Sequence, residues 1–223
     1  MSERRQRIIQ TMKNAGLDGV LYAAGANFQY VSECTKYFWQ RSHMNNMFDR
    51  HTSRILPEAV IWLNTEGDCR IVAIPKLEDQ FPGQKVIVSY LDQMEDTLSF
   101  FVQGKRIGIG YDCREWLANA VKDIDPAAEI IDAELLLKDL RKVKDAGEIK
   151  QLRALAEFTD EAILWVSQHF TEGMTIAEAE NMLMQYGIEH GMDDFSFPPL
   201  IGFKTQGTFT AEQNFDFPRT NRL

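Results

Sequence analysis

The chain has 223 residues, of which 44% are hydrophobic and 26% charged, and its formal net charge is −9. This length suits one and a half to two domains of an ordinary globular protein. Acidic residues outnumber basic ones both before and after residue 140, which argues against a nucleic-acid partner. No apolar run approaches 18 residues, and the N-terminus lacks the apolar segment of a signal peptide, so we expect neither a membrane span nor a secretion signal.

Alternating helices and strands are predicted up to about residue 139 by the spacing of apolar residues. The first helix carries Ile8, Ile9 and Met12 on one side and ends at Gly16. Asp92 is the expected N-cap of a later helix. In chain order the predicted elements are helix 3–15, strand 18–24, a helical turn at 27–31, strands 59–63, 69–74 and 85–90, helix 92–103, strand 106–110, helix 112–124 and strand 129–131.

This alternation indicates an α/β domain. Residues 64–68, Asn-Thr-Glu-Gly-Asp, join two of the strands as a hairpin, so the sheet is predicted to be mixed rather than purely parallel. A GxG pair, Gly108 and Gly110, follows another strand. It lacks a third glycine and leads into Asp112, which would repel phosphate, so a dinucleotide site is disfavoured.

Long helices dominate after residue 139. Asp145 and Glu148 form a capping-box pattern that begins a helix over 145–169, and Thr175 and Glu178 repeat the pattern before a second helix that ends near Gly187 or Gly191. The first of these helices carries an apolar stripe. The stripe consists of Ile149, Leu152, Ala156, Ile163 and Val166. The pair Pro198–Pro199 blocks further helix, and residues 200–201 are predicted to begin a strand.

Three cysteines, Cys34, Cys69 and Cys113, are widely spaced and form no CxxC pair. An odd, scattered set is typical of reduced thiols, so we expect a cytoplasmic protein without disulfides. We expect the three cysteines to be small buried side chains rather than nucleophiles. Cys113 begins a predicted helix, where the thiol could have a lowered pKa.

Four groups of residues, in this order and spacing, resemble one family. The groups are Gly16-Leu17-Asp18 with Asn27 and Tyr30-Val31-Ser32; Arg141, Lys144, Glu148-Ile149 and Leu152-Arg153-Ala154; Gly173-Met174-Thr175 with Glu178 and Glu180; and Ser196-Phe197 with Gly202. Together they resemble the pita-bread metallopeptidases, which include Xaa-Pro aminopeptidases, prolidases and creatinases. The resemblance implies a creatinase-like α/β N-terminal domain with a mixed sheet at 1–139. A truncated α+β pita-bread catalytic domain would then occupy 140–223.

The resemblance also implies hydrolysis of a peptide bond next to proline, in a homodimer with a peptide substrate. Two divalent ions, Mn or Co, would activate water in the full-length protein, held by two Asp, one His and two Glu. These five ligands are expected beyond Leu223, so no catalytic or metal-binding residue is assigned, and this chain alone is expected to bind no metal and to be inactive. Whether Leu223 is a natural end or a truncation stays open.

Two alternatives to the peptidase remain open, namely a creatinase-type amidinohydrolase and a non-catalytic interaction or dimerisation module. The family often has a substrate-facing His shortly before the position of Pro218, where this chain has Phe215, Asp216 and Phe217. Either this branch lacks that proton donor or the register differs by a few residues.

The segment 41–54 is the one locally basic stretch, with the candidate substrate-binding residues Arg41, His43, Arg50 and His51. One interpretation is a solvated loop. The other is a loop that reaches an active site, where an arginine fork binds a substrate carboxylate in bidentate fashion. The two histidines are eight residues apart, which disfavours a helical metal-binding pair.

Overall fold

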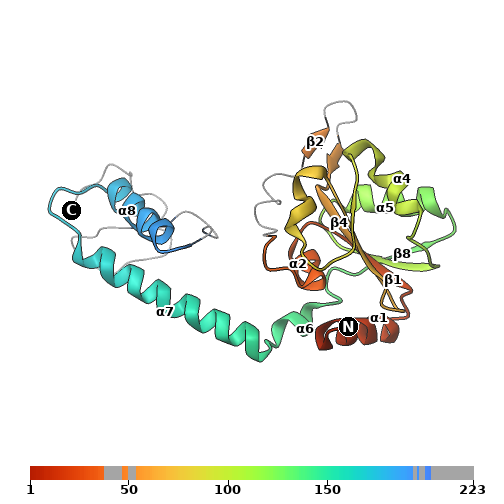
Figure 1. Cartoon of the computed structure of the whole chain (residues 1–223), viewed down its shortest axis with the longest axis horizontal. Coiled ribbons are helices and arrows are strands. Elements are labelled where there is room, and N and C mark those ends of the chain that lie inside the picture. The colour runs from red at the N-terminus through yellow and green to blue at the C-terminus, as the bar shows by residue number, and fades with distance from the viewer. Residues whose placement is uncertain (38–46, 50–53, 193–194, 196–198, 202–223) are drawn as a thin grey trace. The chain divides into compact units, whose positions relative to one another are not determined.

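The computed structural model describes residues 1–37, 47–49, 54–192, 195 and 199–201 (Figure 1). The chain divides into two compact units, Met1–Val143 and Lys144–Leu223. The boundary predicted at 139/140 falls inside the short helix α6 (Lys138–Lys142), which belongs to the first unit.

A six-stranded mixed sheet forms the centre of the first unit, in the order β6-β5-β4-β1-β7-β8. Its strands are β1 (Gly19–Ala23), β4 (Ala59–Asn64), β5 (Cys69–Ala73), β6 (Val86–Val88), β7 (Arg106–Ile109) and β8 (Glu129–Asp132). Strands β1, β4 and β5 pair antiparallel, whereas β7 and β8 extend β1 in parallel and β6 pairs parallel with β5. The predicted α/β class, the hairpin and the mixed sheet are therefore confirmed.

Helices cover both faces of this sheet (Figure 1). The helices of the first unit are α1 (Glu3–Asn14), α2 (Ala26–Ser32), α4 (Met94–Ser99), α5 (Arg114–Ile124) and α6, with 3-10 turns η1 (Pro75–Gln80) and η2 (Leu91–Gln93). All five residues of β1 are buried, as expected for a strand with packing on both faces. Val20 and Tyr22 join one hydrophobic cluster with α1 and α2, while Leu21 and Ala23 join the other with α4 and α5, because side chains alternate along a strand.

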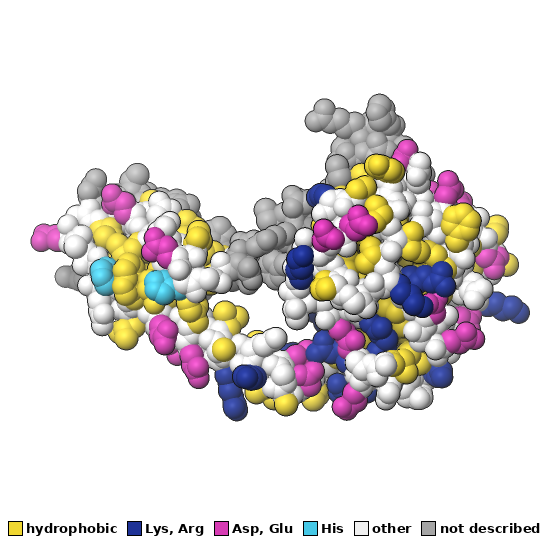
Figure 2. Space-filling model, viewed as in Figure 1, with side chains coloured by type: hydrophobic (Ala, Val, Ile, Leu, Met, Phe, Trp, Pro, Cys, Tyr) yellow, Lys and Arg dark blue, Asp and Glu magenta, His cyan; other side chains and the backbone are white. Residues whose placement is uncertain are grey.

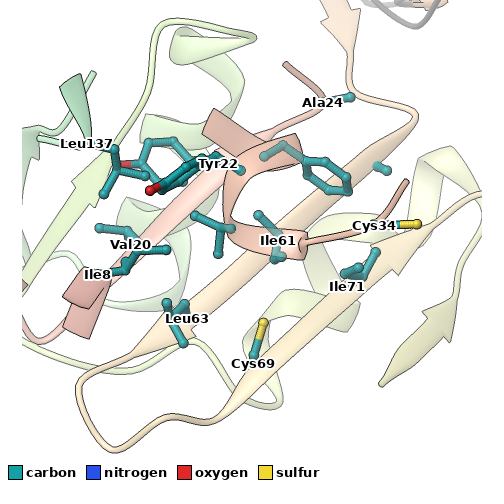
Figure 3. Close-up of a cluster of buried hydrophobic side chains, with 14 of the residues drawn as sticks. Ile8, Val20, Tyr22, Ala24, Cys34, Ile61, Leu63, Cys69, Ile71 and Leu137 are labelled. Atoms are coloured by element: carbon teal, nitrogen blue, oxygen red, sulfur yellow. The ribbon is translucent and has the colours of Figure 1, made fainter. Parts of the chain in front are cut away.

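The first of these clusters gathers residues that are far apart in the sequence (Figure 3). Ile8 and Met12 of α1 are fully buried in it, as their spacing predicted. Leu137, just before α6, also lies in the cluster, so the end of the first unit is fixed to its core. Gly16 adopts φ +66° and its N–H donates to the Lys13 carbonyl, which confirms the predicted end of α1.

The predicted helix 92–103 is wrong in its start and its length. Helix α4 begins only at Met94, and its N-cap is Gln93, whose side chain makes no cap hydrogen bond. Asp92 lies in the preceding turn η2. The start follows from burial, because Met94 and Leu98 are both fully buried against the sheet and set the position of the first turn.

The second unit contains the helices α7 (Ala146–Gln168) and α8 (Ile176–Glu189). Both predicted capping boxes are present. At α7 the Glu148 N–H donates to Asp145 Oδ1 at 2.8 Å, and the Asp145 N–H donates to Glu148 Oε2 at 2.9 Å. Leu200 and Ile201, predicted to begin a strand, lie in neither helix nor strand, and the Ile201 N–H points to Glu180 Oε1 on α8 at 3.4 Å.

The apolar stripe of α7 is not a buried face in the described structure. Of its five residues only Val166 is buried. Ile149, Leu152 and Ile163 are 40%, 52% and 56% exposed. Helix α8 packs instead on a neighbouring side of α7, where Phe158 and Trp165 contact Tyr186. Among the described residues, no helix has both the length and the apolar character that a membrane crossing requires.

Candidate functional site

The four candidate substrate-binding residues, Arg41, His43, Arg50 and His51, lie outside the described residues. Their role stays a prediction. The basic segment is not wholly a loop, because β2 (Met47–Asp49) lies in it and pairs antiparallel with β3 (Arg54–Leu56), which begins at its last residue.

A second candidate site lies at the carboxyl edge of the parallel strands β1, β7 and β8. In open α/β sheets this edge is the usual place for function, because strands and helix starts meet there. In the first unit it brings together the ends of β1 and β8 with α2 and α6. Four side-chain hydrogen bonds join these elements, and we call them the junction clamp.

Asn27 is the centre of the junction clamp. It is 3% exposed, on α2. Its Nδ2 donates to the Glu134 carbonyl at 3.0 Å, and its Oδ1 accepts from Arg141 Nη1 at 2.9 Å. An asparagine amide can donate and accept at once, so this one side chain of α2 binds both the segment after β8 and α6, which lie more than a hundred residues further along the chain.

Two tyrosines complete the junction clamp. The Tyr22 hydroxyl donates to the Ala133 carbonyl at 2.9 Å, and the Tyr30 hydroxyl donates to the Leu140 carbonyl at 3.3 Å. Burial raises the pKa of Tyr22 well above its ordinary value, and the nearby Glu134 carboxylate raises it further. Tyr22 therefore remains a neutral donor at any physiological pH.

Two family marks taken separately from the sequence, Asn27 and Arg141, thus form one hydrogen bond. The sequence analysis did not pair them. The available signal was that Asn27 and Arg141 both belong to the motifs that resemble the family, one near each end of the α/β domain. Their geometry supports a role in holding the end of the first unit in place, because Asn27 binds both the Glu134 carbonyl and the Arg141 guanidinium there.

The glycines of the GxG pair serve close packing in this structure. A Cβ at Gly108 would lie 2.7 Å from Cβ of Ala133, and one at Gly110 would lie 2.8 Å from Cδ1 of Tyr22. Neither position accepts a side chain without displacing neighbours. This gives a structural reason for glycine at both positions without a phosphate ligand.

Carboxylates at the same edge are used to order the backbone. Glu134 Oε2 accepts the Tyr111 N–H at 2.9 Å, and Asp132 Oδ1 accepts the Glu134 N–H at 3.0 Å. Arg114 Nη1 lies 3.8 Å from Asp132 Oδ2. Across the described part of the chain, no group of three or more His, Cys, Asp or Glu side chains is placed to hold a metal ion. The described residues therefore do not fit the two-metal centre that the resemblance implies.

Cys113 does not have the lowered pKa considered from its position. Burial raises the pKa of its thiol to about 12, and the adjacent Asp112 carboxylate contributes in the same direction. Its backbone is left-handed, with φ 51°, so α5 begins at Arg114 and not at the predicted residue 112. All three cysteines are free, as expected, and Cys34 and Cys69 are buried.

The second unit contains a row of stacked rings that the sequence analysis missed. His169 stacks on Trp165 with centroids 4.0 Å apart, Trp165 lies 4.8 Å from Tyr186, and Tyr186 stacks on His190 at 3.9 Å. Each imidazole Nδ1 lies within 2.8 Å of the carbonyl of the aromatic residue four positions earlier. The i, i+4 spacing of both pairs was the available signal.

These rings join α7 to α8, and both imidazoles are exposed (Figure 2). Each histidine follows the last residue of its helix, where the carbonyl groups lack helical donors. The arrangement is therefore explained as helix capping and helix packing. It does not bring the two histidines to a common ligand.

No family model matches this chain. An uncharacterized peptidase of Staphylococcus aureus (strain USA300) is 32% identical over 72 residues, which are 32% of this chain and 20% of that protein. The Xaa-Pro dipeptidase of Pyrococcus horikoshii is 21% identical over 195 residues, 85% of this chain and 50% of the dipeptidase.

Solved structures give the same result for the fold. The prolidase from Thermococcus sibiricus matches with a TM-score of 0.67 at 21% identity, over 89% of this chain and 53% of the prolidase. The Xaa-Pro dipeptidase from Bacillus anthracis matches with a TM-score of 0.62 at 19% identity, over 85% of this chain and 49% of the dipeptidase. The chain thus spans about half the length of these proteins or less. Its relatives in sequence and in structure are those of the prolidase and Xaa-Pro peptidase family, and it matches the region of their N-terminal domain.

Proposed function

We propose that the whole protein is a hydrolase of peptide bonds next to proline, an Xaa-Pro dipeptidase or aminopeptidase. One observation carries the proposal, namely the alignment with an Xaa-Pro dipeptidase over 195 residues. The mixed α/β sheet and the order of the family marks along the chain support it. In this proposal the second unit is the beginning of a pita-bread catalytic domain.

Two divalent ions, Mn or Co, belong to the proposal for the whole protein. When bound, such ions activate a water molecule and polarise the scissile carbonyl. The carboxylates at the edge of the sheet already bind backbone N–H groups, so we assign none of them as a ligand. A cytoplasmic location and a homodimeric state complete the proposal, and the free cysteines agree with the location.

In this proposal the residues of the junction clamp contribute position rather than chemistry. The junction clamp holds residues 133–141 against α2 and β1, so the first unit ends in one defined conformation at α6. Hydrogen bonds of buried and half-buried groups are suited to this task, because water has limited access to replace them when they break. We propose that this fixed end positions the chain that leads into the catalytic domain.

The activity is tested on the protein expressed from its complete coding sequence. After addition of Mn or Co, we expect release of proline from Xaa-Pro dipeptides and no cleavage of a dipeptide without proline. Metal content is measured in the same sample. Hydrolysis of creatine without release of proline would instead support the amidinohydrolase, and a protein that binds no metal and cleaves neither would support the interaction module.

Replacing Arg41 or Arg50 by alanine tests the predicted substrate contact. If either guanidinium binds the substrate carboxylate, KM for an Xaa-Pro dipeptide should rise about tenfold or more, because a charge-assisted hydrogen bond contributes about 1.5–3 kcal/mol. The kcat should change little if the contact is the same in substrate and transition state. Lys36→Ala, a change of an exposed cation nearby in sequence, is the control. Unchanged KM in both arginine variants would exclude this role.

A further inference from the structure

The two ends of the basic segment meet at a buried carboxylate. Tyr37 precedes the segment 41–54, and Glu58 follows it, directly before β4. The Tyr37 hydroxyl donates to Glu58 Oε1 at 3.3 Å, and the two residues are only 4% and 3% exposed. One hydrogen bond therefore joins the point where the chain leaves the core of the first unit to the point where it returns.

Lys76 supplies a positive charge beside this carboxylate. Its Nζ lies 3.0 Å from Glu58 Oε2, and the lysine side chain stays 56% exposed while that of Glu58 is 4% exposed. A carboxylate is rarely buried unless a cation and hydrogen-bond donors accompany it. Lys76 belongs to the turn η1, so the ion pair ties the end of the segment to that turn. We call Tyr37, Glu58 and Lys76 the base cluster.

The start of the segment is held against the same turn. The Tyr37 ring contacts Phe28 of α2 with centroids 5.4 Å apart, and it contacts Phe81, directly after η1, at 4.9 Å. Cys34 Sγ donates to the Gln80 carbonyl at 3.0 Å. Both ends of residues 38–57 are thus fixed beside η1, which offsets part of the entropy lost when a loop of this length is closed.

We propose that the base cluster positions the basic segment and, with it, Arg41 and Arg50. Its three members act as positioning residues, because they hold the ends of the segment and need not touch a substrate. A side chain on a loop binds more tightly when the loop is ordered before the ligand arrives. The part of the inference that concerns a substrate carboxylate rests on the proposed function, whereas the tether itself does not.

Trypsin cleavage of the native 223-residue chain tests the tether. Tyr37→Phe keeps the ring and removes only the hydroxyl, so cleavage after Arg41 and Arg50 should become about fivefold faster. The reason is that local opening of a segment sets its cleavage rate in a folded protein. Cleavage after Arg106, within strand β7, reports global unfolding and should not change. Wild-type rates at both arginines of the segment would overturn the proposal.

Tyr30→Phe is the matched control for cleavage. Its hydroxyl also donates over 3.3 Å and Tyr30 is 8% exposed, but this bond lies in the junction clamp. Cleavage of the basic segment should therefore keep its wild-type rate. Lys76→Met should accelerate it, and Lys76→Arg should not, because arginine keeps the positive charge. Equal acceleration by the two tyrosine variants, or equal rates for the two Lys76 variants, would overturn the base cluster as a specific tether.

Kinetics of the protein from its complete coding sequence test the substrate part. Tyr37→Phe should raise KM for an Xaa-Pro dipeptide about fivefold with little change in kcat. In a variant that already carries Arg41→Ala and Arg50→Ala, the same substitution should have no further effect on KM. An equal rise in that variant would overturn the positioning role while the proposed function stands. A wild type that releases no proline would instead refute the proposed function, and the trypsin result would still decide the tether.

Discussion

Asn27→Ala is expected to lower the free energy of unfolding of the first unit by about 2–4 kcal/mol. The substitution removes both an acceptor for the Arg141 guanidinium and a donor for the Glu134 carbonyl, at a side chain that is 3% exposed. Alanine cannot replace either bond, and water has little access to the site. Urea unfolding followed by far-UV circular dichroism measures the loss.

The control for this prediction is Asn14→Ala. Asn14 also makes a side-chain hydrogen bond, with Gln10 at 2.8 Å, but it is exposed on α1. We expect its loss to cost about 0.5 kcal/mol or less. The double variant Asn27→Ala with Arg141→Ala should cost less than the sum of the single variants, because the two residues share one bond. Strict additivity would contradict the junction clamp.

Gly19→Ala should destabilise the first unit by about 3 kcal/mol or more. A Cβ at this position would lie 2.2 Å from Cη2 of Trp62, which is fully buried on the neighbouring strand β4. The indole is fixed between β1 and the helices α4 and α5, so it cannot move aside without opening a core of high packing density. The change is measured as the shift in the urea midpoint at constant slope.

Removal of the indole should relieve this clash. Trp62→Leu alone is expected to cost about 2–4 kcal/mol through the cavity it leaves. Part of that cost is offset, because the Trp62 Nε1 is buried without a hydrogen-bond partner among the described residues. Gly19→Ala combined with Trp62→Leu should then cost at least 1 kcal/mol less than the sum. If the costs simply add, the alanine is destabilising for a reason other than contact with Trp62.

Local interactions account for the elements that could be read from the sequence. The capping boxes at Asp145 and Thr175, the end of α1 at Gly16 and the hairpin after Asn64 each depend on residues within four positions of one another. Such interactions are encoded in a short window, so a pattern suffices to predict them. The start of α4 was misplaced because burial of Met94 and Leu98 outweighed the capping preference of Asp92.

The sequence by itself determined the α/β class of the first region, its mixed sheet and the likeness to the prolidase family. Apolar periodicity and the order of short motifs are properties of the sequence, so they can be recognised before the structure is known. Only the tertiary structure decided that Asn27 bonds Arg141, that Gly19 lies under Trp62 and that most of the α7 stripe is exposed. Each of these depends on which distant residues meet. Sheet order and helix packing decide those contacts, and no local pattern specifies them.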